Sequence, residues 1–261
     1  MGIYSENVDN RFGQNLKKLR TDIINRFGGF SLLFMDPNEW ERRYHMKFLG
    51  EGNALNYADR GKKLLIIALK NKHYNKLIRN NKAELPPETE RLIAHELGHL
   101  WMESFGFPRL SSSFKDQREE RWYKNCHQPL LTVMEHAIII QWLHTYYKFN
   151  LYEDGDRKLN DFIIKGYKLL PSKIEDPLQE IYLITGYLKY KIEANNCLWL
   201  REFENYWSTK AGYKKIHDKA ELVLPIIQNL EGQGQNPDPE LFKEKFQTVL
   251  NTLEIDKQYW P

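Results

Sequence analysis

The sequence predicts an α+β fold in which a mixed N-terminal half precedes an all-helical C-terminal half. Short apolar runs separated by polar turns occupy residues 30–70, which is typical of strands. Beyond residue 158 the apolar residues recur at helical spacing only. The polar, glycine-containing stretch NLYEDGDRK (150–158) separates the two patterns, so we expect one domain over residues 1–150 and a helical domain or subdomain over 151–261.

The N-terminal half is expected to open with a helix over residues 11–27, which Gly28 and Gly29 would end. Short strands are expected at 30–36, 45–50, 54–59 and 62–69, and Asp59-Arg60-Gly61 is a plausible hairpin turn between the last two. The strand at 62–69 either forms an edge that pairs with an extended peptide or lies inside the sheet.

A second helix is expected to start at Pro86 and Pro87, where proline and the acidic Glu88 suit a helix N-terminus, and to end before Gly106. A strongly apolar helix should begin at Pro129. Further helices are expected near 159–170, 177–195, 197–230 (broken around Gly212) and 238–254.

The helix after Pro87 contains two histidines at a spacing that suits a metal ion. In RLIAHELGHLWM (91–102), His95 and His99 are four residues apart and therefore lie on one face of the helix. Glu96 follows His95 directly and projects to the side, where it could hold a water molecule. This is the H-E-x-x-H arrangement of zinc peptidases, and it predicts Zn²⁺ bound by His95 and His99.

A catalytic zinc site needs a third protein ligand. The residue six positions after His99 is Phe105, so a third histidine ligand at that position is excluded. The preferred candidate is Glu135, an acid inside the apolar helix that follows. His136 is the alternative, because adjacent helical positions point about 100° apart and only one of the two can face the metal.

The motif resembles the R-F-x-x-A-H-E-L-G-H-L segment of the ImmA/IrrE-type zinc metallopeptidases, which are small gluzincins. The matching residues are Arg91, Ala94, His95, Glu96, Leu97, Gly98 and His99. The resemblance covers about residues 50–148 and implies a zincin-like N-terminal half, with a small twisted sheet, the HExxH helix and a second ligand helix. In that family a glutamate on a following helix is the third ligand, which corresponds to Glu135, although the surrounding Asn and Phe-Ala of the family are absent.

These observations predict a zinc-dependent metallopeptidase that hydrolyses peptide bonds of a protein or peptide substrate. Glu96 would take the proton of the attacking water, and zinc would lower the pKa of that water towards about 7. Tyr146 shares a helical face with Glu135 and is the first choice for stabilising the oxyanion. The alternative is a regulatory or scaffold protein with a structural or idle zinc site, which could associate with DNA through its basic N-terminal helix.

Composition limits the remaining classes. The net charge of +3 does not by itself require a nucleic-acid partner, so nucleic acid is not the favoured partner. The two cysteines do not suggest a disulfide framework. The N-terminus lacks the apolar core of a secretory signal, and the longest apolar runs fall far short of the ~20 residues that span a bilayer. We therefore expect a soluble, cytoplasmic protein without a membrane partner, of unknown oligomeric state.

Overall fold

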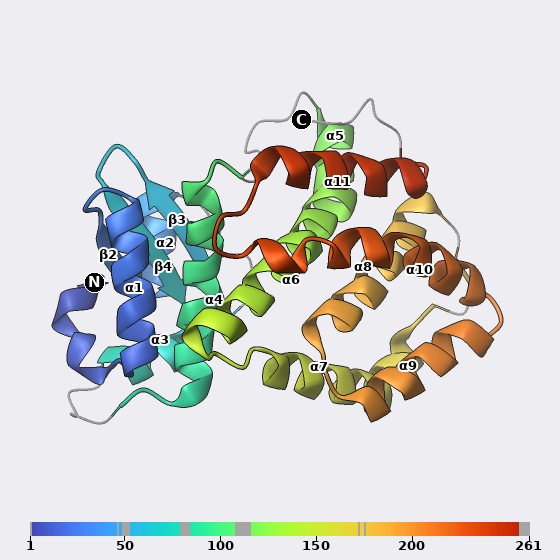
Figure 1. Ribbon diagram of the computed structural model, residues 1–261, viewed down its shortest axis with the longest axis horizontal. Coiled ribbons are helices and arrows are strands. Elements are labelled where there is room, and N and C mark those ends of the chain that lie inside the picture. Colours follow the sequence, from blue (N-terminus) through green and yellow to red (C-terminus); the bar gives the residue numbers. More distant parts are fainter. Residues whose placement is uncertain are drawn as a thin grey trace. The chain divides into compact units, whose positions relative to one another are not determined.

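The computed structural model describes residues 2–45, 47–48, 53–78, 84–107, 116–171, 173–174 and 176–255, except for the side chains of residues 118 and 119. The architecture is α+β, with a four-stranded mixed sheet near the N-terminus followed by a largely helical C-terminal half (Figure 1). The chain divides into two compact units. The first contains Met1–Phe107 and Leu143–Phe149, and the second contains Pro108–Trp142 and Asn150–Pro261. The domain limits at residue 150 stay a prediction.

The sheet of the first unit consists of β1 (Ile3–Tyr4), β2 (Ser31–Met35), β3 (Ala54–Asp59) and β4 (Leu64–Leu69). Its strand order is β1-β2-β4-β3, with β2 and β4 parallel and the two outer pairs antiparallel. The expected hairpin between β3 and β4 is confirmed. Because β4 lies between β2 and β3, the edge interpretation of this strand is wrong, and β3 is an outer strand of the described sheet.

Helices cover the sheet of the first unit: α1 (Gln14–Arg26), α2 (Pro37–Tyr44), α3 (Asn71–Ile78) and α4 (Pro87–Ser104). Strand alternation directs Leu33 and Ile66 to one face, where they pack with Trp40 of α2. The opposite face includes Phe34, whose ring meets that of Phe12 edge-on. Helices α1 and α4 pack together, and α4 also contacts β3 and β4. The motif helix is therefore supported by the sheet.

Two helices of this unit were missed from the sequence. Helix α2 lies between the expected strands at 30–36 and 45–50, where no helix was expected, although Asp36 caps it and Pro37 opens it, which are ordinary helix-start signals. His45 ends α2 in the left-handed conformation (φ 53°). The expected strand at 45–50 is wrong at its start, and residues 46, 49 and 50 lie outside the described residues. A single residue separates helix α3 from the end of β4.

The second unit is helical in its described residues. It contains α5 (Gln117–Trp122), a π-helical turn (Tyr123–His127), most of α6 (Gln128–Tyr147), α7 (Tyr152–Lys165), α8 (Pro177–Glu193), α9 (Cys197–Thr209), α10 (Lys214–Gln228) and α11 (Pro239–Thr252). Its core is rich in aromatic side chains. The rings of Tyr187 and Phe203 stack at 5.1 Å between centroids, and Trp207 meets both. These contacts join α8 to α9, and α10 packs on both helices.

The stretch 150–158 is mostly helical, although its composition suggested an irregular segment. Helix α7 starts at Tyr152 and continues through Gly155, which is buried inside it. A Cβ atom at Gly155 would lie only 1.9 Å from the backbone oxygen of Glu193, so this glycine allows α7 and the end of α8 to approach closely. The expected break of the long helix near Gly212 is confirmed, because Gly212 adopts a φ of +89° between α9 and α10.

Both cysteines are free thiols, Cys126 buried and Cys197 exposed, which agrees with the absence of a disulfide framework. In the part of the chain that the structure describes, no helix is both long enough and apolar enough to cross a membrane.

Candidate metal centre

Helix α4 is anchored at its first turn by three contacts within the first unit. The backbone N–H of Gly13 donates a hydrogen bond to Oε1 of Glu90 over 2.6 Å. Thr89 Oγ1 and His73 Nδ1 lie 3.1 Å apart, and Lys76 forms an ion pair with Glu88. These contacts join α4 to α3 and to the start of α1, so the helix that contains the motif has a fixed N-terminus.

The last turn of α4 is held by aromatic packing. Phe105 is the C-cap residue, and its ring lies 5.1 Å from that of Trp101. The guanidinium carbon of Arg26, at the end of α1, lies 3.9 Å from the centroid of the Phe105 ring, within the range of a cation–π interaction. Phe105, which occupies the position of the excluded third histidine, thus helps to hold the end of α4 in place.

The two histidines of the motif lie on one face of α4, as their spacing predicted. The centroids of their rings are 4.9 Å apart, and both side chains are half-buried. Gly98 and Leu97 between them are buried. Helix geometry therefore brings the two histidines to one face, because residues i and i+4 stand one above the other.

Glu96 is buried beside this pair, and strand β3 holds its carboxylate. Asn56 of β3 donates a hydrogen bond from Nδ2 to Oε2 of Glu96 over 2.6 Å. Only 7% of Glu96 is exposed, so this carboxylate needs a polar partner to offset its lost hydration. The contact fixes the direction of Glu96 and places β3 next to it.

His136 of α6 is buried and bonded to a glutamate of α8. Its Nδ1 atom lies 2.6 Å from Oε1 of Glu193. Because an ionised carboxylate only accepts hydrogen bonds, Nδ1 of His136 is the donor, and Nε2 is the ring nitrogen that would bind a metal once it carries no proton. Burial raises the pKa of Glu193, but the charge and hydrogen bond of His136, together with Lys189 and Lys158, outweigh burial and lower it.

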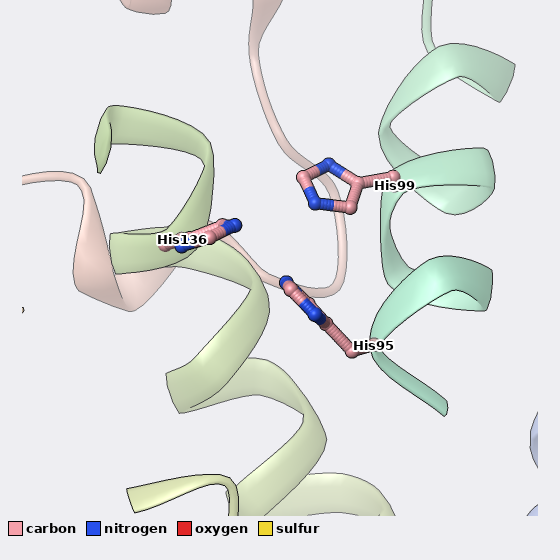
Figure 2. Close-up of side chains that lie close together, drawn as sticks. All are labelled: His95, His99 and His136. Carbon is pink, nitrogen blue, oxygen red and sulfur yellow. The ribbon is translucent and has the colours of Figure 1, made fainter. Parts of the chain in front are cut away.

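Three histidines form a cluster of metal-ligating side chains, with His95 and His99 contributed by α4 and His136 by α6. One ring nitrogen from each lies within 4.8 Å of the other two. Figure 2 shows the three rings directed toward a common space. We call these residues the three-histidine cluster.

The cluster fits a transition metal by its donor chemistry. Neutral imidazole nitrogens are common ligands of zinc, copper, iron and nickel. Zn–N bonds of about 2.0–2.1 Å place tetrahedral ligand nitrogens ~3.3 Å apart, so small ring rotations close a cluster of this size on one ion. Among the described residues the group has three members, and a tetrahedral ion would take one further ligand.

The third member of the cluster is the alternative rather than the preferred sequence candidate. Glu135 is half-buried and does not belong to the group, whereas His136 does. Glu135 as a zinc ligand stays a prediction, and the arrangement of nitrogen atoms favours His136. A gluzincin ligand set, which needs a glutamate at this place, is therefore not supported.

The other predicted site residues have different settings. Glu96 lies beside the histidine pair on α4, but its catalytic role stays a prediction. Tyr146 is 43% exposed near the end of α6, and its role as oxyanion donor is likewise untested. Two polar partners were missed from the sequence. Asn56 and Glu193 lie 40 and 57 residues from the side chains that they contact, and no local spacing could have identified them.

Comparison with known proteins finds no family, no curated protein and no solved structure that matches this chain. The likeness to the ImmA/IrrE-type metallopeptidases consequently rests on the residues of α4 that carry the motif.

Proposed function

We propose that this protein is a zinc-dependent hydrolase that cleaves peptide bonds, with zinc held by the three-histidine cluster. The observation that carries the proposal is the combination of this cluster with Glu96, a buried carboxylate next to His95 on the same helix. Three imidazoles and an open position are the arrangement of catalytic zinc sites, whereas structural sites use four protein ligands.

Zinc at this position would supply a Lewis acid that polarises a carbonyl oxygen and lowers the pKa of water towards about 7. The remaining chemistry falls to side chains of this protein. Glu96 would accept the proton of the attacking water and pass it to the leaving amine. Asn56 supports this step because its hydrogen bond holds one oxygen of Glu96 in place and leaves the other to receive the proton.

The position of β3 supports a peptide as the substrate. It is an outer strand of the described sheet, it contacts α4, and its Asn56 reaches Glu96. An extended peptide that adds to an outer strand gains main-chain hydrogen bonds along its length. A peptide paired with β3 would run past Glu96, which is where the proposed proton transfer takes place.

The proposal is tested with the full chain loaded with one equivalent of zinc and a mixture of fluorescence-quenched peptides. We expect zinc-dependent cleavage that Glu96→Gln lowers by about 10²–10⁴-fold while zinc remains bound. Glu88→Gln is the matched control, because Glu88 lies on the same helix but pairs with Lys76, and it should cleave like the unaltered protein. Equal cleavage by Glu96→Gln would overturn the mechanism.

The competing interpretation is a zinc site without catalysis. It predicts tight zinc binding and no cleavage of any peptide, and it predicts a fourth protein ligand at the metal. X-ray absorption of the zinc-loaded protein counts these ligands. Three nitrogen ligands and one oxygen from water support the hydrolase, and a fourth protein ligand supports the structural role.

A further inference from the structure

The end of helix α8 contains a buried acid in an electrostatically unfavourable place. Glu193 is the last residue of α8, where the helix dipole presents its negative end, and it is only 6% exposed. A buried carboxylate at a helix C-terminus is costly unless strong partners compensate for it. Its closest partner is His136, at 2.6 Å. The two lysines near it, Lys158 and Lys189, are 3.8 and 3.9 Å away.

The backbone around Glu193 is built to keep this acid in position. Gly155 of α7 lies against the backbone oxygen of Glu193, at a distance that no side chain would permit. Asp156 accepts hydrogen bonds from the backbone N–H groups of Asn195 and Asn196, each over 2.7 Å. Helix α7 thus holds both the last residue of α8 and the turn that follows it.

We propose that Glu193 is a positioning residue for the metal centre, which it serves by orienting His136. The inference rests on the proposed function, because it assumes that His136 binds zinc. Glu193 accepts a hydrogen bond from the Nδ1–H group of His136, so the ring keeps the tautomer whose Nε2 lone pair can bind a metal. Carboxylates that hold ligating histidines in this way fix the ring and make it a stronger ligand.

Glu193 would also offset part of the charge of a bound zinc ion. Three neutral imidazoles leave the full double charge of a zinc ion without an anionic ligand. Glu193 places one negative charge a hydrogen bond away from His136, and the two lysines contact it from their partly exposed positions. The acid therefore supports the metal electrostatically without occupying a coordination position.

Zinc affinity of Glu193→Gln tests the proposal, measured by competition with a chromophoric chelator on the full chain. We expect zinc to bind about 10- to 100-fold more weakly than in the unaltered protein. Glu180→Gln is the matched control. Glu180 is also on α8 and also contacts two lysines, Lys215 and Lys219, and its replacement should leave zinc affinity unchanged. Unchanged affinity in Glu193→Gln would overturn the proposal.

A second measurement needs no variant and separates positioning from a merely structural role. Nitrogen NMR of the zinc-loaded protein reports which ring nitrogen of His136 is protonated. We expect the proton on Nδ1 and the metal on Nε2, and the reverse would overturn the proposal. If zinc does not bind the unaltered protein at all, the proposed function fails and this role with it. If zinc binds through His136 but Glu193→Gln binds equally well, only the positioning role fails.

Discussion

The two helices that supply the three-histidine cluster differ in what fixes their histidines. On α4, the helix period places His95 and His99 on one face, four residues apart. On α6, His136 is directed by a contact with Glu193, which lies 57 residues further along the chain. One part of the site is therefore local and readable from a short sequence, and the other depends on tertiary structure.

The largest expected effect is the loss of a histidine from α4. His95→Ala or His99→Ala removes a direct ligand, so zinc should bind more weakly by more than the ~100-fold that loss of an outer partner typically causes. Chelator competition measures this. His144→Ala is the control, since His144 is exposed on α6 and outside the cluster. An α4 variant with unchanged affinity would show that the motif spacing does not create a metal site.

The next effect separates catalysis from metal binding within the first unit. Asn56→Ala removes the hydrogen bond to the Glu96 carboxylate, and such a bond to a charged group contributes about 1.5–3 kcal/mol. We expect peptide cleavage to fall about 10- to 100-fold while zinc affinity stays the same. Tyr57→Phe is the control, because Tyr57 is directed to the other face of β3. A loss of zinc in Asn56→Ala would mean that the contact supports the metal instead.

In the second unit, two glycines should respond differently to replacement by alanine, because only one of them lies where α7 and α8 approach closely. Gly155→Ala places a Cβ atom 1.9 Å from the backbone oxygen of Glu193 and should cost about 1–3 kcal/mol of stability, with weaker zinc binding. Gly186→Ala, inside α8, meets no heavy atom within 4 Å and should gain up to ~1 kcal/mol. Thermal unfolding compares them. Equal effects would contradict the packing role of Gly155.

The smallest expected effect is that of replacing Glu180, the control residue on α8. Burial raises the pKa of Glu180, but hydrogen bonds and charges of Lys219 and Lys215 outweigh it and lower the pKa below 4.5. Its contribution to stability is thus present above pH 4.5 and lost as the pH falls through the lowered pKa. Glu180→Gln should cost about 0.5 kcal/mol at pH 7 and progressively less in acid. A cost that grows in acid would contradict this sign.

The sequence predicted the features of the fold that depend on local periodicity. The α+β organisation, the β3–β4 hairpin, the motif helix and the helix break at Gly212 agree with the structure. Helix α3 was missed because it is short and only a single residue separates it from the end of β4. Gly155 suggested a loop because a glycine that permits close packing and a glycine that ends a helix look alike in sequence.

For the candidate metal site as well, the sequence predicted only the part that depends on local periodicity. The spacing of His95 and His99 identified the α4 half. The choice between Glu135 and His136 could not be made from sequence, because both are polar residues within an apolar helix and the contact of His136 with Glu193 forms only in the folded chain. A contact between residues so far apart along the chain leaves no periodic signal, and neither does the contact between Asn56 and Glu96.

The most direct test of the three-histidine cluster compares two neighbouring variants of α6. His136→Gln and Glu135→Gln introduce the same side chain one position apart, and the zinc affinity of each full chain is measured by chelator competition. We predict that His136→Gln loses zinc affinity by more than ~100-fold and that Glu135→Gln binds zinc like the unaltered protein. The reverse outcome, with affinity lost in Glu135→Gln and kept in His136→Gln, would contradict the proposed centre.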